Sequence, residues 1–188
     1  MVKDYFKLQN QLLIAMPGMT DPRFEHTVIL VVRHTDEGCF GITINQPSKT
    51  KIGDLFDHLE ITSTDEEINS TLVLTGGPVQ PEQGFVLHDS DQHWENTLPI
   101  SNNLAITASK DILSDIAIDK GPCNFLLTLG CASWTAGQIE SEILENAWLN
   151  CPVESAILFD MPFHQRWKNA SKTLGVDVSL MTEFSGHA

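Results

Sequence analysis

The sequence CNFLLTLG, residues 123–130, is an almost continuous apolar run of strand length, and CASWTAGQIE, residues 131–140, follows it directly. Apolar residues at successive positions predict a strand that is covered on both faces of its sheet. After the small residues that follow this run, residues 136–148 have apolar side chains at helical spacing. This stretch therefore predicts a buried strand that turns into a helix.

The chain before this stretch has mostly strand-like patterns. Runs rich in β-branched and apolar residues predict strands at 11–15, 27–33 and 39–45. The turn residues Asp36, Glu37 and Gly38 join the last two as an antiparallel hairpin. Further along, the sequence predicts a helix at 52–59 and strands at 71–75 and 84–88, with a turn at Gly76-Gly77-Pro78-Val79 between the strands.

The second half alternates between helices and strands. Helical spacing predicts helices at 109–118, 136–148 and 164–174, and apolar runs predict strands at 123–129 and 155–159. An antiparallel hairpin followed by β-α-β-α order predicts a mixed α/β fold, in which helices flank a mixed sheet. Because no linker, repeat or low-complexity segment interrupts the chain, we expect one domain over residues 1–188.

Composition excludes several classes of protein. The 188 residues carry 11 Lys and Arg against 25 Asp and Glu, a net charge of −14, which disfavours nucleic acid and anionic membrane surfaces as partners. No apolar run reaches the length of about 18 residues that a membrane span needs, and we see no export signal. The four cysteines show no C-x-x-C spacing, so we expect reduced thiols, no metal, no cofactor and a cytoplasmic location.

Glu140 stands out on a helical wheel of the segment after the buried strand. Thr135 and Gln138 fit a capping box, which sets the helix start near Ala136. With that phase Glu140 lies among apolar residues, where a carboxylate needs a partner. We therefore expect Glu140 to be largely buried and to bind loop amides or a basic side chain. A structural acceptor is favoured over a general base or ligand-binding carboxylate.

Three other features allow a functional and a structural interpretation. Cys131 precedes a helix, where a thiol can become reactive, but a small buried hydrophobe is the favoured interpretation because no histidine lies at a fixed short spacing. The helix N-terminus itself could hold an anion. The Gly76-Gly77-Pro78 turn could admit a ligand to the backbone, although a plain tight turn explains it equally well.

Taken together, these motifs resemble the bacterial YqgE/AlgH family over nearly the whole chain. Its signature L-G-Y-A-G-W-x-x-G-Q-L-E is similar to residues 129–140, with Cys131 in place of the usual Tyr and Ser133 in place of the usual Gly. The other residues that carry the resemblance are Pro17-Gly18-Met19, His34, Gly38, Gly41, Asn45, Pro47, Gly76-Gly77-Pro78-Val79, Leu87-His88, Asn146-Ala147-Trp148-Leu149, Phe159-Asp160, Trp167, Leu174-Gly175-Val176-Asp177 and Gly186-His187-Ala188.

The resemblance implies a cytoplasmic protein of mixed α/β fold with coiled sheets. It carries over no catalytic residues, because the family has no assigned reaction, and the usual Tyr at position 131 disfavours a mechanism that needs the Cys131 thiol. One branch is labelled as a regulator of alginate synthesis, which implies a transcriptional role.

The leading hypothesis is a non-enzymatic binding or accessory protein that recognises a protein partner or a small ligand. The binding face would lie around the Gly76 turn and residues 130–140, and its candidate residues are His34, Asn45, Gly76, Gly77, Pro78, Trp134, Gln138 and Glu140. The alternatives are a hydrolase or thiol-dependent enzyme that uses Glu140 or Cys131 with a histidine from the first half, and a transcriptional regulator.

Overall fold

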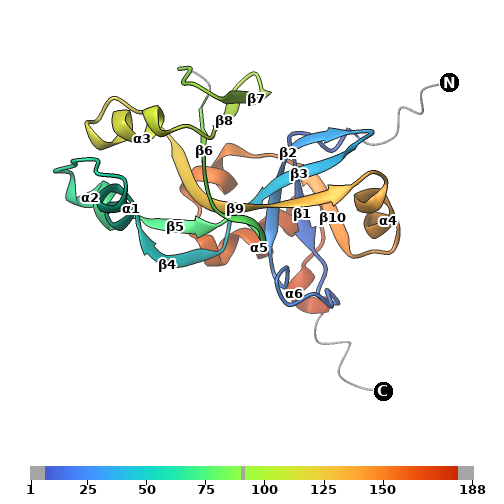
Figure 1. The fold of residues 1–188 in the computed structure, drawn as a ribbon. Coiled ribbons are helices and arrows are strands. Elements are labelled where there is room, and N and C mark those ends of the chain that lie inside the picture. Colours follow the sequence, from blue (N-terminus) through green and yellow to red (C-terminus); the bar gives the residue numbers. More distant parts are fainter. Residues whose placement is uncertain (1–6, 90–91, 182–188) are drawn as a thin grey trace. The chain divides into compact units, whose positions relative to one another are not determined.

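The computed structural model describes residues 7–89 and 92–181, which form two compact units (Figure 1). The first unit contains the described residues up to Asn45 and those from Ala132 onward, and the second unit is Gln46–Cys131. Each unit has its own cluster of buried apolar side chains. The assignment of 1–188 to one domain stays a prediction, and the segment Gly186-His187-Ala188 lies outside the described residues.

The first unit is built on an antiparallel sheet. Its strands follow the order β10-β1-β2-β3-β9, and each pair of neighbours is antiparallel. The predicted hairpin is confirmed, because Thr35 pairs with Gly38 across the turn of Asp36 and Glu37. The bounds are β1 Gln11–Ala15, β2 Val28–Thr35, β3 Gly38–Thr43, β10 Trp148–Pro152 and, with its last residues only, β9 Phe125–Thr135.

Two predicted elements of the first unit are wrong. The helix predicted at 136–148 is shorter, α4 Gln138–Leu144, and Trp148 already belongs to strand β10. The strand predicted at 155–159 is instead a π-helical turn, η1 Ala156–Asp160. Ile157 and Leu158 are buried there, and a short apolar run has the same pattern in a buried helix as in a buried strand.

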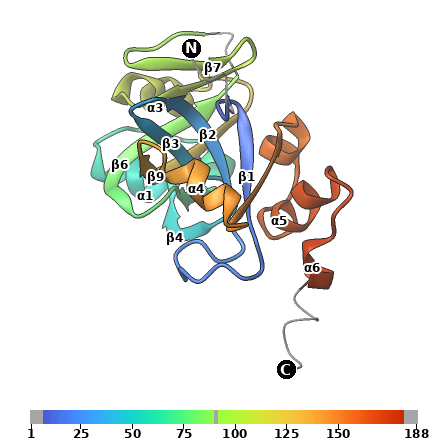
Figure 2. The same ribbon diagram turned by 90° about the vertical axis from the view of Figure 1, so that its right-hand side faces the viewer.

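Helix α5 Phe163–Lys172 packs against strand β1 of the same unit (Figure 2), and a short helix, α6 Val178–Met181, follows it. The indole of Trp167 donates a hydrogen bond to the backbone oxygen of Ala15 at 2.8 Å. The Arg166 guanidinium, 2% exposed, donates to the backbone oxygens of Met161 and Ile44 at 3.0 and 2.5 Å. Burial lowers the pKa of Arg166 to about 10, which still leaves it charged at neutral pH.

The second unit has a mixed sheet. Strand β6 Val79–His88 pairs antiparallel with β9 and with β8 Leu104–Thr107, and β8 pairs with β7 Thr97–Ser101. Strand β5 Leu72–Thr75 pairs parallel with β9 and antiparallel with β4 Pro47–Lys51. With the antiparallel hairpin of the first unit and the flanking helices, the predicted mixed α/β class is confirmed.

Helices α1 Ile52–His58 and α3 Lys110–Ala117 cover the sheet of the second unit. Ile52 and Phe56 from α1 and Ile112 and Ile116 from α3 are buried in one cluster with Leu127 of β9. Both helices were expected from their apolar spacing, and both are confirmed. The sequence did not indicate strands β4, β7 and β8 or helix α2 Glu66–Ser70, whose buried residues are few or absent except in β8.

Strand β9 is longer than predicted. It continues through Gly130 to Thr135, where a turn into a helix was expected. Gly130 has a φ of 77°, a conformation that glycine adopts without strain, and a Cβ atom added at Gly76 would lie 2.2 Å from the Gly130 backbone oxygen. Gly76 and Gly130 are therefore glycines because two backbone segments of the second unit come into direct contact.

Replacing Gly76 by alanine should lower the free energy of unfolding by about 2 kcal/mol or more, since its methyl group would overlap a backbone oxygen that cannot turn away. Urea denaturation followed by circular dichroism measures this change. The matched control is Gly84→Ala, where an added Cβ meets nothing within 4 Å. Equal stability of the two variants would contradict the proposed backbone contact.

Candidate functional site

The candidate residues from the sequence are divided between the two units. His34, Asn45, Trp134, Gln138 and Glu140 belong to the first unit. The other candidates, which belong to the second unit, are Gly76, Gly77, Pro78 and Cys131.

Glu140 of α4 pairs with His34 of β2. The Nε2 atom of His34 lies 2.9 Å from Glu140 Oε1, and the backbone N–H of Leu8 donates to His34 Nδ1 at 3.4 Å. Since Nδ1 accepts a hydrogen bond, the ring proton is on Nε2 and is donated to the carboxylate. The expected basic partner is thus present. The Glu140 side chain is 34% exposed, but its Oε2 atom is buried and accepts no hydrogen bond from the described residues, so the expected burial holds for this oxygen.

The arrangement of His34 does not suit general base catalysis. Both ring nitrogens are engaged within the protein, so no lone pair is directed toward a substrate proton. Nearby, burial and the Glu140 charge raise the pKa of the Cys39 thiol to about 12, which keeps it protonated. The contacts of Glu140 are those of a residue that joins α4 to β2.

The predicted capping box forms only in part. Gln138 Oε1 accepts a hydrogen bond from the Thr135 N–H at 3.0 Å, as expected. The Thr135 hydroxyl, however, also donates to Gln138 Oε1, and the helix is preceded by Gly137 at a φ of 75°. Helix α4 therefore starts two residues later than predicted. The anion site that the sequence suggested at its N-terminus stays a prediction.

Glu142, which the sequence did not indicate, is the carboxylate that organises this region. Its Oε2 atom accepts hydrogen bonds from the indoles of Trp134 at 3.0 Å and Trp148 at 2.8 Å. Its Oε1 atom accepts a third bond from Gln138 at 2.9 Å, and Phe24 packs against both indoles. The indole N–H of a buried Trp can only donate, so it needs an acceptor nearby. The need of two tryptophans for an acceptor is the signal that could have identified Glu142. Glu142, Gln138, Trp134 and Trp148 are called the Glu142 clasp below.

Replacing Glu142 by alanine should lower the free energy of unfolding by about 2–4 kcal/mol, because two indole N–H groups lose their acceptor and Trp148 is 2% exposed. Chemical denaturation monitored by tryptophan fluorescence measures the loss. At the C-cap that follows the same helix, Glu145→Ala provides the control, since Glu145 is exposed and the change in the free energy of unfolding should stay within about 0.5 kcal/mol. A Glu142 variant as stable as the Glu145 variant would show that the clasp does not stabilise the unit.

Asn45 has a structural explanation as well. Its Oδ1 atom accepts a hydrogen bond from the Val28 N–H and its Nδ2 atom donates to the His26 backbone oxygen, both at 2.8 Å. These bonds fix the chain that enters strand β2, and they use both ends of the amide. The role of Asn45 in binding stays a prediction.

The candidates of the second unit are held by backbone contacts and burial. The Gly76 N–H donates to the Leu129 oxygen at 2.7 Å, and Pro78 leads into strand β6. Cys131 is 4% exposed, and burial raises the pKa of its thiol, so the nucleophilic thiolate is disfavoured at neutral pH. This environment supports the expectation of a small buried hydrophobe at position 131.

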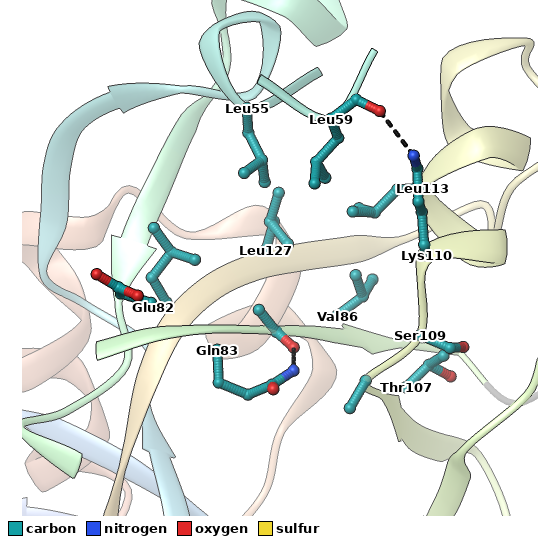
Figure 3. Close-up of a pocket in the computed structure, with 13 residues that line it drawn as sticks. Leu55, Leu59, Glu82, Gln83, Val86, Thr107, Ser109, Lys110, Leu113 and Leu127 are labelled. Atoms are coloured by element: carbon teal, nitrogen blue, oxygen red, sulfur yellow. Dashed lines mark hydrogen bonds between the residues drawn. The ribbon is translucent and has the colours of Figure 1, made fainter. Parts of the chain in front are cut away.

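A cavity in the second unit was not indicated by the sequence. Its volume is about 220 Å³, and it lies between helices α1 and α3 and the sheet (Figure 3). The apolar part of its lining is Leu55, Leu59, Val86, Leu113, Leu127 and Leu129. The remaining lining residues are Glu82, Gln83, Gly84, Thr107, Ala108, Ser109 and Lys110.

Thr107 connects this lining to a buried polar network. Its hydroxyl lies 2.8 Å from Nε2 of His88, which has no exposed surface, and 2.7 Å from the Thr97 hydroxyl. The Nδ1 atom of His88 contacts the backbone oxygen of Asp89. Because Nδ1–H then donates, Nε2 accepts the Thr107 proton, and burial lowers the pKa of His88, so that the ring is neutral at neutral pH.

The free energy of unfolding should fall as the pH drops below about 6.5, the ordinary value for histidine, because the unfolded chain then binds a proton that folded His88 resists. For one proton, the free energy of unfolding changes by at most about 1.4 kcal/mol per pH unit. Urea titrations between pH 7.5 and 5.5 test this. The variant His88→Gln should lose this dependence on pH. The control variant His58→Gln, at an exposed histidine, should keep it. An unchanged dependence in His88→Gln would show that His88 is not its source.

Within 7–89 and 92–181, no group of three or more His, Cys, Asp or Glu side chains is placed to hold a metal ion. No helix in the same ranges is both long and apolar enough to cross a membrane.

The fold defines an α/β protein, and comparison with known proteins assigns its family. Residues 12–179 match the model of the AlgH-like family, to which the chain therefore belongs. Among similar proteins, a UPF0301 protein from Methylococcus capsulatus is 47% identical over 180 residues, and one from Stenotrophomonas maltophilia is 42% identical over 180 residues. Both matches cover 96% of this chain and 96% of the relative.

Solved structures agree with this assignment. The solution structure of the AlgH protein from Pseudomonas aeruginosa matches with a TM-score of 0.80 and 40% identity, and the match covers 100% of this chain and 99% of that one. A crystal structure of a protein from Corynebacterium diphtheriae has a TM-score of 0.72 at 18% identity, over 92% of this chain and 90% of that one. That second likeness shows the fold alone.

Proposed function

We propose that the protein is a non-enzymatic accessory protein that binds a small ligand, and that the ligand occupies the cavity of the second unit. The observation that carries this proposal is the cavity itself. Its apolar walls come from α1, α3, β6 and β9, so that a ligand would contact several separate elements at once. Apolar walls with a few polar groups are the usual lining of a small-molecule site.

The size of the cavity restricts the ligand. Sites for drug-sized molecules have volumes of roughly 300–1,000 Å³, and this cavity of about 220 Å³ is smaller. A ligand of metabolite size, or the apolar part of a larger molecule, therefore fits best.

The contacts of the proposed catalytic residues favour binding over catalysis. His34 has both ring nitrogens engaged, and the Cys131 thiol has a pKa that is raised by burial. The net charge of −14 also disfavours a regulator that contacts DNA directly. The four cysteines are all free, which supports our proposal of a cytoplasmic protein.

Titration with 1-hexanol, a neutral apolar probe, tests the proposal. In ¹⁵N–¹H NMR spectra we expect saturable shifts at the amides of Leu55, Val86, Leu113 and Leu127. The variant Leu113→Trp should fill the cavity and remove these shifts. Leu98→Trp places the same indole in the same unit at a site that is 37% exposed and outside the cavity lining, and it should keep them. Shifts that do not saturate, or that persist in Leu113→Trp, would contradict the proposal.

A further inference from the structure

We infer that the ligand of this cavity is a short aliphatic carboxylic acid, whose carboxylate binds Lys110 while its chain lies against the leucines. This inference rests on the proposed function, and it adds the chemical class of the ligand. It starts from the position of a cation at the edge of an apolar cavity (Figure 3).

Lys110 is held in place but keeps donors for a ligand. Its ammonium donates a hydrogen bond to the backbone oxygen of Leu59 at 2.6 Å, and the side chain passes beside Leu113 (Figure 3). An ammonium has three N–H donors, so two are left after this bond. In the described parts of the chain, no carboxylate forms an ion pair with Lys110. The site thus offers a positioned cation that lacks an anion.

A positioned cation selects an anionic head group. A hydrogen bond between a charged donor and a carboxylate is roughly twice as strong as a neutral one. Lys110 is exposed, and its bond to Leu59 places the ammonium at the edge of the cavity, so that a ligand meets a cation at that edge. The carboxylate would therefore bind next to the Leu59 oxygen, on the two remaining donors.

The opposite side of the cavity sets the orientation of the ligand. Glu82 lines that side, is exposed, and in Figure 3 its carboxylate lies away from the leucines. Two carboxylates repel each other, so an acid enters with its head group at Lys110 and its apolar chain toward Leu127. A ligand with an ammonium head group would have the reverse preference, which makes the sign of the ligand charge a decisive test.

The neighbouring Asp111 carboxylate does not form an ion pair with Lys110. The adjacent Asp111 carboxylate already accepts hydrogen bonds from the N–H groups of Glu95 and Ile112, both at 2.9 Å, and from the Ser109 hydroxyl. The rest of the net charge of −14 is distributed over the chain, and salt screens exposed charges beyond about 8 Å at physiological ionic strength. The local cation therefore decides which head group is preferred.

The volume of the cavity indicates the length of the apolar chain. An engineered apolar cavity of about 150 Å³ holds a six-carbon ring. The present cavity of about 220 Å³ therefore accommodates a chain of about six carbons, with room for the head group at its edge.

Three probes of equal chain length, hexanoate, 1-hexanol and hexylamine, separate this inference from the proposed function. Their dissociation constants are measured by NMR titration of the full chain. We expect hexanoate to bind about tenfold more tightly than 1-hexanol, as a charge-assisted bond implies. The variant Lys110→Met should remove this advantage, so that hexanoate no longer binds more tightly than 1-hexanol. Lys120→Met, at an exposed lysine of the same unit outside the lining, should keep it.

The possible failures can be told apart. If 1-hexanol and hexanoate bind equally well, or if hexylamine binds most tightly, the inference is wrong while the proposed function stands. An advantage of hexanoate that survives in Lys110→Met would also overturn it. If none of the three probes binds in the cavity, the proposed function itself fails.

Discussion

The contact between the backbones of Gly76 and Gly130 is the constraint on which the second unit depends. The Gly76 N–H donates to the Leu129 oxygen, and no side chain fits between the two glycines. This contact holds the end of β5 against β9, while β6 pairs with the other edge of β9. Leu127 and Leu129, on the same strand, then form part of the cavity wall. Pairing of β9 with β5 and with β6 thus holds this part of the cavity wall in place.

Elements with a strong apolar pattern could be predicted from the sequence. Strand β1 was found because it is a short apolar run, and helices α1 and α3 were found because their buried residues recur at helical spacing. Strand β4, with the sequence PSKTK, and strand β7, which contains Pro99, have no such pattern and are held by their pairing partners. The extension of β9 through Gly130 was missed because small residues after an apolar run are equally typical of a turn.

The candidate sites, like the secondary structure, could be predicted only in part. The sequence identified a carboxylate on α4, Glu140, that pairs with a basic residue and has a buried oxygen atom. Glu142 was missed because its two indole partners, Trp134 and Trp148, belong to strands β9 and β10, where the sequence predicted a turn and a helix. The cavity could not be predicted, because Leu55, Leu113 and Leu127 come from three elements that are distant in sequence and meet only in the fold.

The central claim is that the second unit binds an aliphatic acid between α1 and α3, and a crystal structure of the protein grown with hexanoate tests it most directly. The account predicts electron density for the acid in the cavity, with a carboxylate oxygen within about 3.2 Å of Lys110 Nζ and the chain against Leu127. An empty cavity, or an acid bound elsewhere on the protein, would contradict it.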